Sequence, residues 1–180
     1  MEGGSPSTKA PTVKVWDPIV RIFHWTVVVA CTLNFFILEE GKYWHRMTGY
    51  VVAGAIVVRI LWGFIGTKHA RFKDFLPTPR RVRTQLREIV GRNERRYIGH
   101  NPLASIMMLI LMALLSATAL TGWMITLDAF WGEKWLQQLH ETIANSIMVL
   151  VFIHAGAAIL ESWRHRENLV WSMVTGRKKA

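Results

Sequence analysis

Residues 139–158 read LHETIANSIMVLVFIHAGAA and place two histidines, His140 and His154, in one long apolar run. The two positions are 14 residues apart. In an α-helix this separation comes within roughly 40° of a whole number of turns and spans about 21 Å along the axis. We therefore expect both imidazoles on one helix face, one near each side of a bilayer whose apolar core is about 30 Å thick.

Four segments of the chain are long and apolar enough to cross a membrane as helices. We expect them at about 19–38, 47–66, 102–127 and 139–163. A soluble helix of this length would show a polar stripe, which these segments mostly lack. The sequence therefore predicts an all-α integral membrane four-helix bundle, formed by a single multi-pass domain at residues 17–164.

The chain is strongly basic, with a formal net charge of +10. Ten of its 22 Lys and Arg residues lie between Lys68 and Arg96, in the connection between the second and third spans. Others precede the first span or follow the fourth, whereas the remaining two connections hold only three. This asymmetry follows the positive-inside rule and predicts that both termini are cytoplasmic. The partner implied by the charge is membrane lipid and not nucleic acid.

Two short polar segments flank the predicted membrane domain. Residues 1–16 are rich in Gly, Ser and Pro, and we expect a cytoplasmic N-terminal tail without the features of a removable signal peptide. Residues 165–180 are expected to form a basic cytoplasmic C-terminal tail.

Three pairs of residues have the pattern of helix starts, in which a capping side chain precedes proline. Asp17-Pro18 and Asn101-Pro102 are predicted to begin the first and third spans. Thr78-Pro79 is predicted to begin a short amphipathic helix in the basic connection, which Gly91 ends. We expect this helix to lie on anionic lipid, with docking of a protein partner as the alternative.

The four histidines of the apolar spans sort into two pairs by depth. His24 and His154 lie near the cytoplasmic side, on the first and fourth spans, whereas His45 and His140 lie near the outer side. Neutral imidazole is a good iron ligand, and helical bundles bind haem between side chains of facing helices. We therefore expect two haem b groups, an inner one on His24 and His154 and an outer one on His45 and His140.

Other roles are open to these histidines. They could form interhelical hydrogen bonds or a proton relay. Zinc is disfavoured because each level offers two histidines and no convincing further ligand. A transporter is disfavoured because the chain shows neither a paired repeat nor a broken helix. Gly49, Gly54 and Gly156 would give a flat macrocycle clearance, although small residues are common in membrane helices.

Arg59 and His100 are two further candidate site residues. Arg59 interrupts the apolar second span 14 residues after His45, which places it near the inner haem. An intramembrane arginine is costly unless paired, so we expect a contact with a haem propionate, with snorkelling towards headgroups as the alternative. His100 precedes the third span and could assist proton exchange with a quinone.

Four short segments resemble a known family. They are IFHW at 22–25, YWHRMTGY at 43–50, LHETIAN at 139–145 and FIHAGAA at 152–158. With these segments the chain, from about Val15 to Arg177, resembles the prokaryotic cytochrome b561 family, which includes the b-type cytochrome subunits of nickel–iron hydrogenases. The resemblance implies that the four histidines bind two b haems in a four-helix bundle.

The resemblance also implies a function and partners. Such proteins transfer electrons across the bacterial inner membrane between the quinone pool (ubiquinone or menaquinone) and a partner such as a periplasmic c-type cytochrome or a hydrogenase. The alternative is a stand-alone enzyme, because some compact relatives oxidise superoxide with quinone as acceptor. Lys42, Arg46 and Lys134 near the outer haem could attract that anion. Stopped-flow mixing of the oxidised protein with superoxide separates the two, since a relay would show no haem reduction. The oligomeric state is left open.

Overall fold

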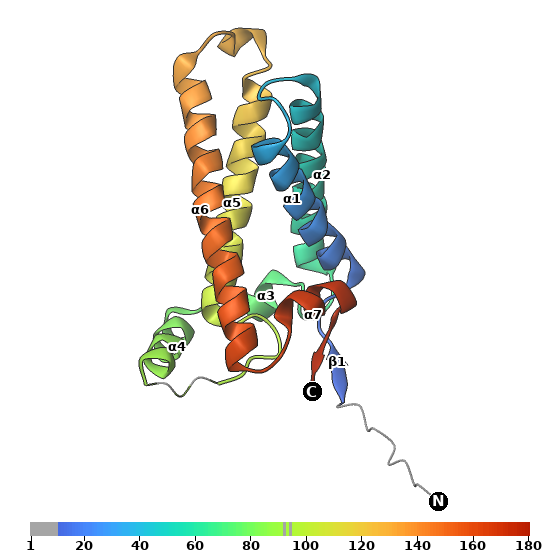
Figure 1. The fold of residues 1–180 in the computed structure, drawn as a ribbon, viewed down its shortest axis with the longest axis vertical. Helices are drawn as coiled ribbons and strands as arrows, with labels where there is room; N and C mark the ends of the chain where they lie inside the picture. Colours follow the sequence, from blue (N-terminus) through green and yellow to red (C-terminus); the bar gives the residue numbers. More distant parts are fainter. Residues whose placement is uncertain (1–10, 92, 94) are drawn as a thin grey trace, which may run out of the picture.

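The computed structural model describes residues 11–91, 93 and 95–180 of the 180-residue chain. Most of the predicted N-terminal tail, residues 1–10, lies outside the described residues. Four long helices form a bundle (Figure 1): α1 Pro18–Phe36, α2 Tyr43–Ile65, α5 Pro102–Met124 and α6 Lys134–Arg164. Each is long and apolar enough to cross a membrane, so the chain is a multi-pass membrane protein.

Two of these helices begin earlier than the sequence predicts. Helix α6 starts at Lys134 instead of about residue 139, and its added turn is anchored by Leu136, whose side chain is 1% exposed. Helix α2 starts at Tyr43, so His45 lies within its first turn. The added turns place His45 and His140 on regular helix, where backbone hydrogen bonds limit their movement.

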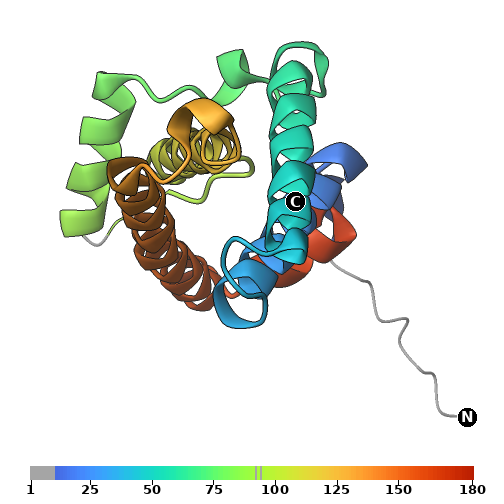
Figure 2. The same cartoon turned by 90° about the horizontal axis from the view of Figure 1, so that it is seen from above.

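The bundle packs in the order α1, α2, α5, α6, and the view from above shows these helices arranged as an arc (Figure 2). Its core is a cluster of five buried apolar residues that draws on all four helices. These residues are Ala30, Val52, Ile56, Leu115 and Ile147. Burial of a Val, Leu or Ile side chain contributes about 1.5–3 kcal/mol to folding in water. In lipid, close packing supplies most of the attraction between helices.

The predicted helix starts are confirmed. Asp17 caps α1 by accepting a hydrogen bond from the Val20 amide at 3.0 Å, and Asn101 caps α5 by accepting one from the Ala104 amide at 2.7 Å. Thr78 caps the amphipathic helix α4, Pro79–Val90, as its sequence predicts. In each case a side-chain oxygen satisfies an amide that the first turn leaves without a backbone partner.

Short elements gather at one end of the bundle, where α1 and α5 begin and α2 and α6 end. We call this the basal end, and the opposite end, which carries the 3-10 helix η1 Asp128–Phe130, the apical end (Figure 1). The basal elements are β1 Thr12–Lys14, α3 Phe72–Phe75, α4, α7 Leu169–Thr175 and β2 Arg177–Lys179. The strands pair antiparallel, with Val13 opposite Lys178.

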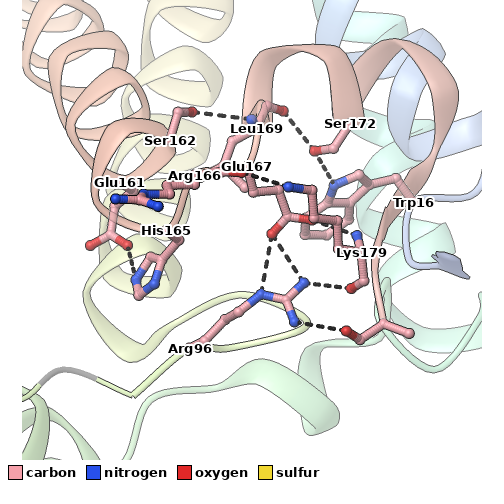
Figure 3. Close-up of polar contacts among 11 residues, drawn as sticks. Trp16, Arg96, Glu161, Ser162, His165, Arg166, Glu167, Leu169, Ser172 and Lys179 are labelled. Atoms are coloured by element: carbon pink, nitrogen blue, oxygen red, sulfur yellow. Dashed lines mark hydrogen bonds and ion pairs between the residues drawn. The ribbon is translucent and has the colours of Figure 1, made fainter. Parts of the chain in front are cut away.

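The segment 165–180 is folded onto the basal end by a carboxylate. Glu167, 7% exposed, accepts hydrogen bonds from Arg96 at 3.1 and 3.3 Å and from the Lys179 amide at 2.6 Å (Figure 3). Trp16 donates to the Ser172 hydroxyl at 3.4 Å, which ties the chain before α1 to α7. Residues expected from sequence to be tails are therefore in contact with each other.

Asp17 links α1 to the end of α2 as well as capping its own helix. Its second carboxylate oxygen accepts hydrogen bonds from Trp62 at 3.0 Å and Thr67 at 2.6 Å. Burial by itself raises the pKa of Asp17, but the hydrogen bonds from Thr67, Trp62 and the Val20 amide outweigh burial and hold this pKa below its usual 3.8. The folded chain therefore favours the ionised carboxylate.

Asp17→Asn is expected to destabilise the folded protein by about 1–3 kcal/mol at pH 7, because it weakens a cap and two charge-assisted hydrogen bonds. The pKa of Asp17 is lower in the folded chain, so its contribution is full above about pH 3.8 and is lost as pH falls through the folded value. Thermal unfolding in detergent, followed by circular dichroism, should show the gap between wild type and variant closing below pH 3.8.

Asp74→Asn is the matched control, because Asp74 pairs with Arg71 at a partly exposed site and such pairs contribute little. A gap between wild type and Asp17→Asn that is the same at every pH would show that the Asp17 charge does not stabilise the fold.

Candidate functional site

The apical pair of histidines is brought together by α2 and α6. The ring centroids of His45 and His140 are 6.4 Å apart and the ring planes are inclined by 66°. Nδ1 of His45 is buried and has no hydrogen-bond partner in the described part of the chain. Two imidazoles from different helices thus face one another at the level predicted from their depth.

The basal pair comes from α1 and α6. His24 lies about 9 Å along α1 from its start at Pro18, and His154 lies about 15 Å before the end of α6 at Arg164, so both are near the basal end. The Nδ1 of His24 is also buried without a partner among the described residues. Its ring packs edge-on against that of Trp25, with the ring centroids 5.2 Å apart. The rings of the apical pair lie near one another, whereas the pairing of His24 with His154 stays a prediction.

The residues around the two pairs fit a flat group ligated by imidazole. A buried ring nitrogen without a partner is uncommon in folded proteins, and His24 and His45 each have one. A Cβ added to Gly49, Gly54 or Gly156 would meet no neighbouring atom within 4 Å, so helix packing does not explain these glycines. The ligand chemistry and the space beside the helices therefore both suit haem.

Arg59 is buried in α2 near the basal end, and only 1% of the residue is exposed. Its Nη2 donates to the Ala70 carbonyl at 3.2 Å, and its guanidinium carbon lies 5.5 Å from the ring of Phe72 and 6.0 Å from that of Phe75. Nη1 is buried without a partner, and no carboxylate of the described residues lies within ion-pair distance. The side chain does not snorkel to the surface, and Asp17 attracts its charge without forming an ion pair.

His100 stands between two aromatic rings at the basal end. Its ring centroid is 4.6 Å from that of Trp16 and 5.1 Å from that of Phe75, and its Nδ1 is buried without a described partner. Burial, followed by the positive charges of Arg59 and Lys178, lowers the pKa of His100 to about 3. The imidazole is therefore neutral near pH 7 and can donate or accept a hydrogen bond without carrying charge.

Two contacts of His140 are missing from the sequence-based site. Its Nδ1 lies 3.0 Å from the hydroxyl oxygen of Thr121, and Gly122 stands directly against its ring. Both residues belong to α5, the one spanning helix without a histidine. A lone threonine in an apolar helix usually bonds its own backbone, so its type alone gave no indication of this contact. Lys42, Arg46 and Lys134 are exposed near the apical end.

Four apolar helices, three of which carry histidines, define a helical membrane protein with candidate haem ligands. A family model described as prokaryotic cytochrome b561 matches residues 15–176. The chain belongs to this family, which confirms the resemblance found in its histidine segments. Membership implies haem b as the cofactor.

Relatives in several bacteria are named probable Ni/Fe-hydrogenase B-type cytochrome subunits. The protein from Bradyrhizobium diazoefficiens is 25% identical over 221 aligned positions, covering 98% of this chain and 90% of the relative. Those from Rhizobium leguminosarum bv. viciae and Cupriavidus necator are 24% and 25% identical, each covering 97% of this chain and 92% and 91% of the relatives. No solved structure matches the chain significantly.

Proposed function

We propose that this chain is a di-haem b-type cytochrome that transfers electrons across the bacterial inner membrane between quinone and a partner redox protein. The observation that carries the proposal is the arrangement of four intramembrane histidines as two pairs, about 21 Å apart along α6. His45 and His140 would ligate the apical haem, and His24 and His154 the basal haem. Bound haem supplies one-electron redox chemistry, and its potential depends on ligands and surroundings.

The protein's own part is to fix the ligands and to surround them with apolar helix. Residues 17–164 form the membrane domain of the proposal, with the flanking segments 1–16 and 165–180 outside it. The basal end is assigned to the cytoplasm, because the basic connection between α2 and α5 meets β1 and β2 there, the first and last described elements. The exposed arginines of α4 then face the anionic cytoplasmic leaflet.

Arg59 is assigned to a propionate of the basal haem. Among the described residues Asp17 attracts the buried charge of Arg59 but forms no ion pair with it, and the Arg59 Nη1 has no hydrogen-bond acceptor. A carboxylate from the cofactor would supply both and form a charge-assisted contact. His100 is assigned to quinone binding at the same end, where its neutral imidazole would hydrogen-bond the quinone, ubiquinone or menaquinone, and would not act as a charged acid.

The partner protein is placed at the apical end, which is periplasmic in this topology. The relatives are named as hydrogenase cytochrome subunits, so a hydrogenase is the first partner to test and a periplasmic c-type cytochrome the second. The alignments run over more positions than the 180 residues of this chain, so the relatives carry insertions that this chain lacks. A partner contact formed by such insertions would be absent here.

The proposal predicts two b haems per chain. Protein purified after expression with an adequate haem supply should give this ratio by pyridine haemochrome assay, together with a low-spin b-type spectrum after reduction. The reason is that each histidine pair supplies both axial ligands of one iron, which favours the low-spin state. Haem-free protein, or a ratio of one in a fully folded sample, would contradict it.

A further inference from the structure

Helix α5 contributes no histidine, yet two of its residues hold the ring of His140. The Thr121 hydroxyl oxygen lies 3.0 Å from Nδ1 of His140. Thr121 is buried, with 6% of its surface exposed, so water does not compete freely for this contact.

The hydrogen bonds of Thr121 determine which ring nitrogen of His140 carries the proton. The Thr121 hydroxyl has one proton to donate, and the backbone carbonyls of Ala117 at 2.8 Å and Thr118 at 3.1 Å are both within its reach. Donation to either carbonyl leaves the hydroxyl oxygen to accept from His140, which assigns the proton to Nδ1. The lone pair on Nε2 is left available for a metal.

Gly122 restricts the orientation of the same ring. A Cβ added at this position would lie 3.0 Å from Cε1 of His140 and 3.5 Å from its Nδ1. Only glycine lets α5 approach the imidazole this closely without displacing it. Thr121 and Gly122 therefore both meet the Nδ1–Cε1 edge of the ring, one through a hydrogen bond and the other through close packing.

We propose that Thr121 is a positioning residue for the apical haem: it fixes His140 as the Nδ1–H tautomer, aims Nε2 at the iron and makes the ligand more basic. The proposal rests on the proposed function, because it needs His140 to be a ligand. A hydrogen bond of this kind usually orients a metal-ligating histidine and strengthens its donation to the metal. His24 and His45 have a buried Nδ1 without such a partner among the described residues. The apical ligand pair is therefore unequal.

The test compares Thr121→Val with two reference variants in purified, haem-loaded protein. Thr121→Val keeps the shape of the side chain and removes the hydroxyl that accepts from His140, whereas Thr121→Ser keeps that hydroxyl. Thr118→Val also removes a threonine hydroxyl, but this one donates to the Leu114 carbonyl of its own helix. The readouts are the midpoint potential and the low-spin electron paramagnetic resonance signal of the apical haem, assigned by its absence in His45→Ala. Neither readout depends on electron-transfer activity.

Thr121→Val is expected to raise the apical potential, because a less basic imidazole stabilises ferric iron less, and to weaken apical haem retention by about 10- to 100-fold. Its apical resonance signal should shift as the ring reorients, while the basal haem is unchanged. Thr121→Ser and Thr118→Val should both resemble wild type. An apical haem unaffected by Thr121→Val, or affected equally by Thr118→Val, overturns the positioning role.

Failure of this inference is distinguishable from failure of the proposed function. Wild-type protein that binds no haem would refute the proposed function. Protein that binds two haems, with an apical potential and resonance signal unchanged by Thr121→Val, would refute only the role of Thr121. If Thr121→Val does not assemble, Gly122→Ala presses on the same ring without altering the hydroxyl. A shifted apical signal in that variant supports the constraint by α5, and an unshifted one overturns it.

Discussion

His140→Ala is expected to lower the haem content from two per chain to one, with the basal haem retained. The apical iron would lose one of its two axial imidazoles, while the ligands of the other level lie about 21 Å away along α6 and are unaffected. His45→Ala should give the same result from the facing helix. The measurement is the haem-to-protein ratio together with a redox titration, which should change from two components to one.

His24→Ala and His154→Ala should have the mirror-image effect, removing the basal component. His165→Ala is the matched control, because this histidine bonds Glu161 at 3.1 Å on its own helix, outside both pairs, and should keep two haems. Loss of both haems in a variant that still folds would refute the assignment of the ligands by depth. A His24→Ala variant that loses the same haem as His45→Ala would refute it too.

The four spanning helices and their starts could be predicted from sequence because the causes are local. A span needs only length and apolar composition, and a cap needs one side chain next to its own first turn. Each of the three capping residues precedes a proline and caps the helix that this pair predicts; they are Asp17, Thr78 and Asn101. The early start of α6 could not be predicted because residues 134–138 are mixed in polarity. Leu136 is buried by tertiary contacts, which the local sequence does not report.

The contacts of the basal end could not be predicted because they join residues far apart in sequence. Glu167 meets Arg96 across 71 positions, and β1 pairs with β2 across nearly the whole chain. Composition showed only that these segments are polar and basic. The burial of Arg59 beneath α3 is of the same kind, since an arginine in an apolar span can equally extend to the headgroups.

The candidate site could be proposed from sequence where one helix carries two of its members, but not where a helix contributes only supporting contacts. The spacing of His140 and His154 gives their common face directly from helix geometry. Thr121 acts through a contact between α5 and α6 that no periodicity reports. Ligands are recognisable by residue type, whereas the groups that orient them are ordinary residues identified by their neighbours.

Arg59→Leu is expected to shift the midpoint potential of the basal haem downward. Removing a nearby positive charge disfavours the reduced and more negative state of the iron, and the guanidinium lies at the basal end of α2. At an effective dielectric of about 20, a unit charge about 10 Å away contributes on the order of 1 kcal/mol, or roughly 40 mV for one electron. A potentiometric titration that resolves the two haems measures this shift.

The apical haem should shift about half as far, because His45 lies about 21 Å along α2 from Arg59 and the Coulomb energy falls inversely with distance. Arg59→Lys is the matched control, since it keeps the charge while losing the planar contacts with Phe72 and Phe75, and it should retain most of the wild-type potential. If Arg59→Leu moves the apical haem more than the basal one, both the pairing of ligands by depth and the role given to Arg59 are wrong. If Arg59→Lys shifts the basal potential as far as Arg59→Leu does, the buried guanidinium acts through packing and not through its charge.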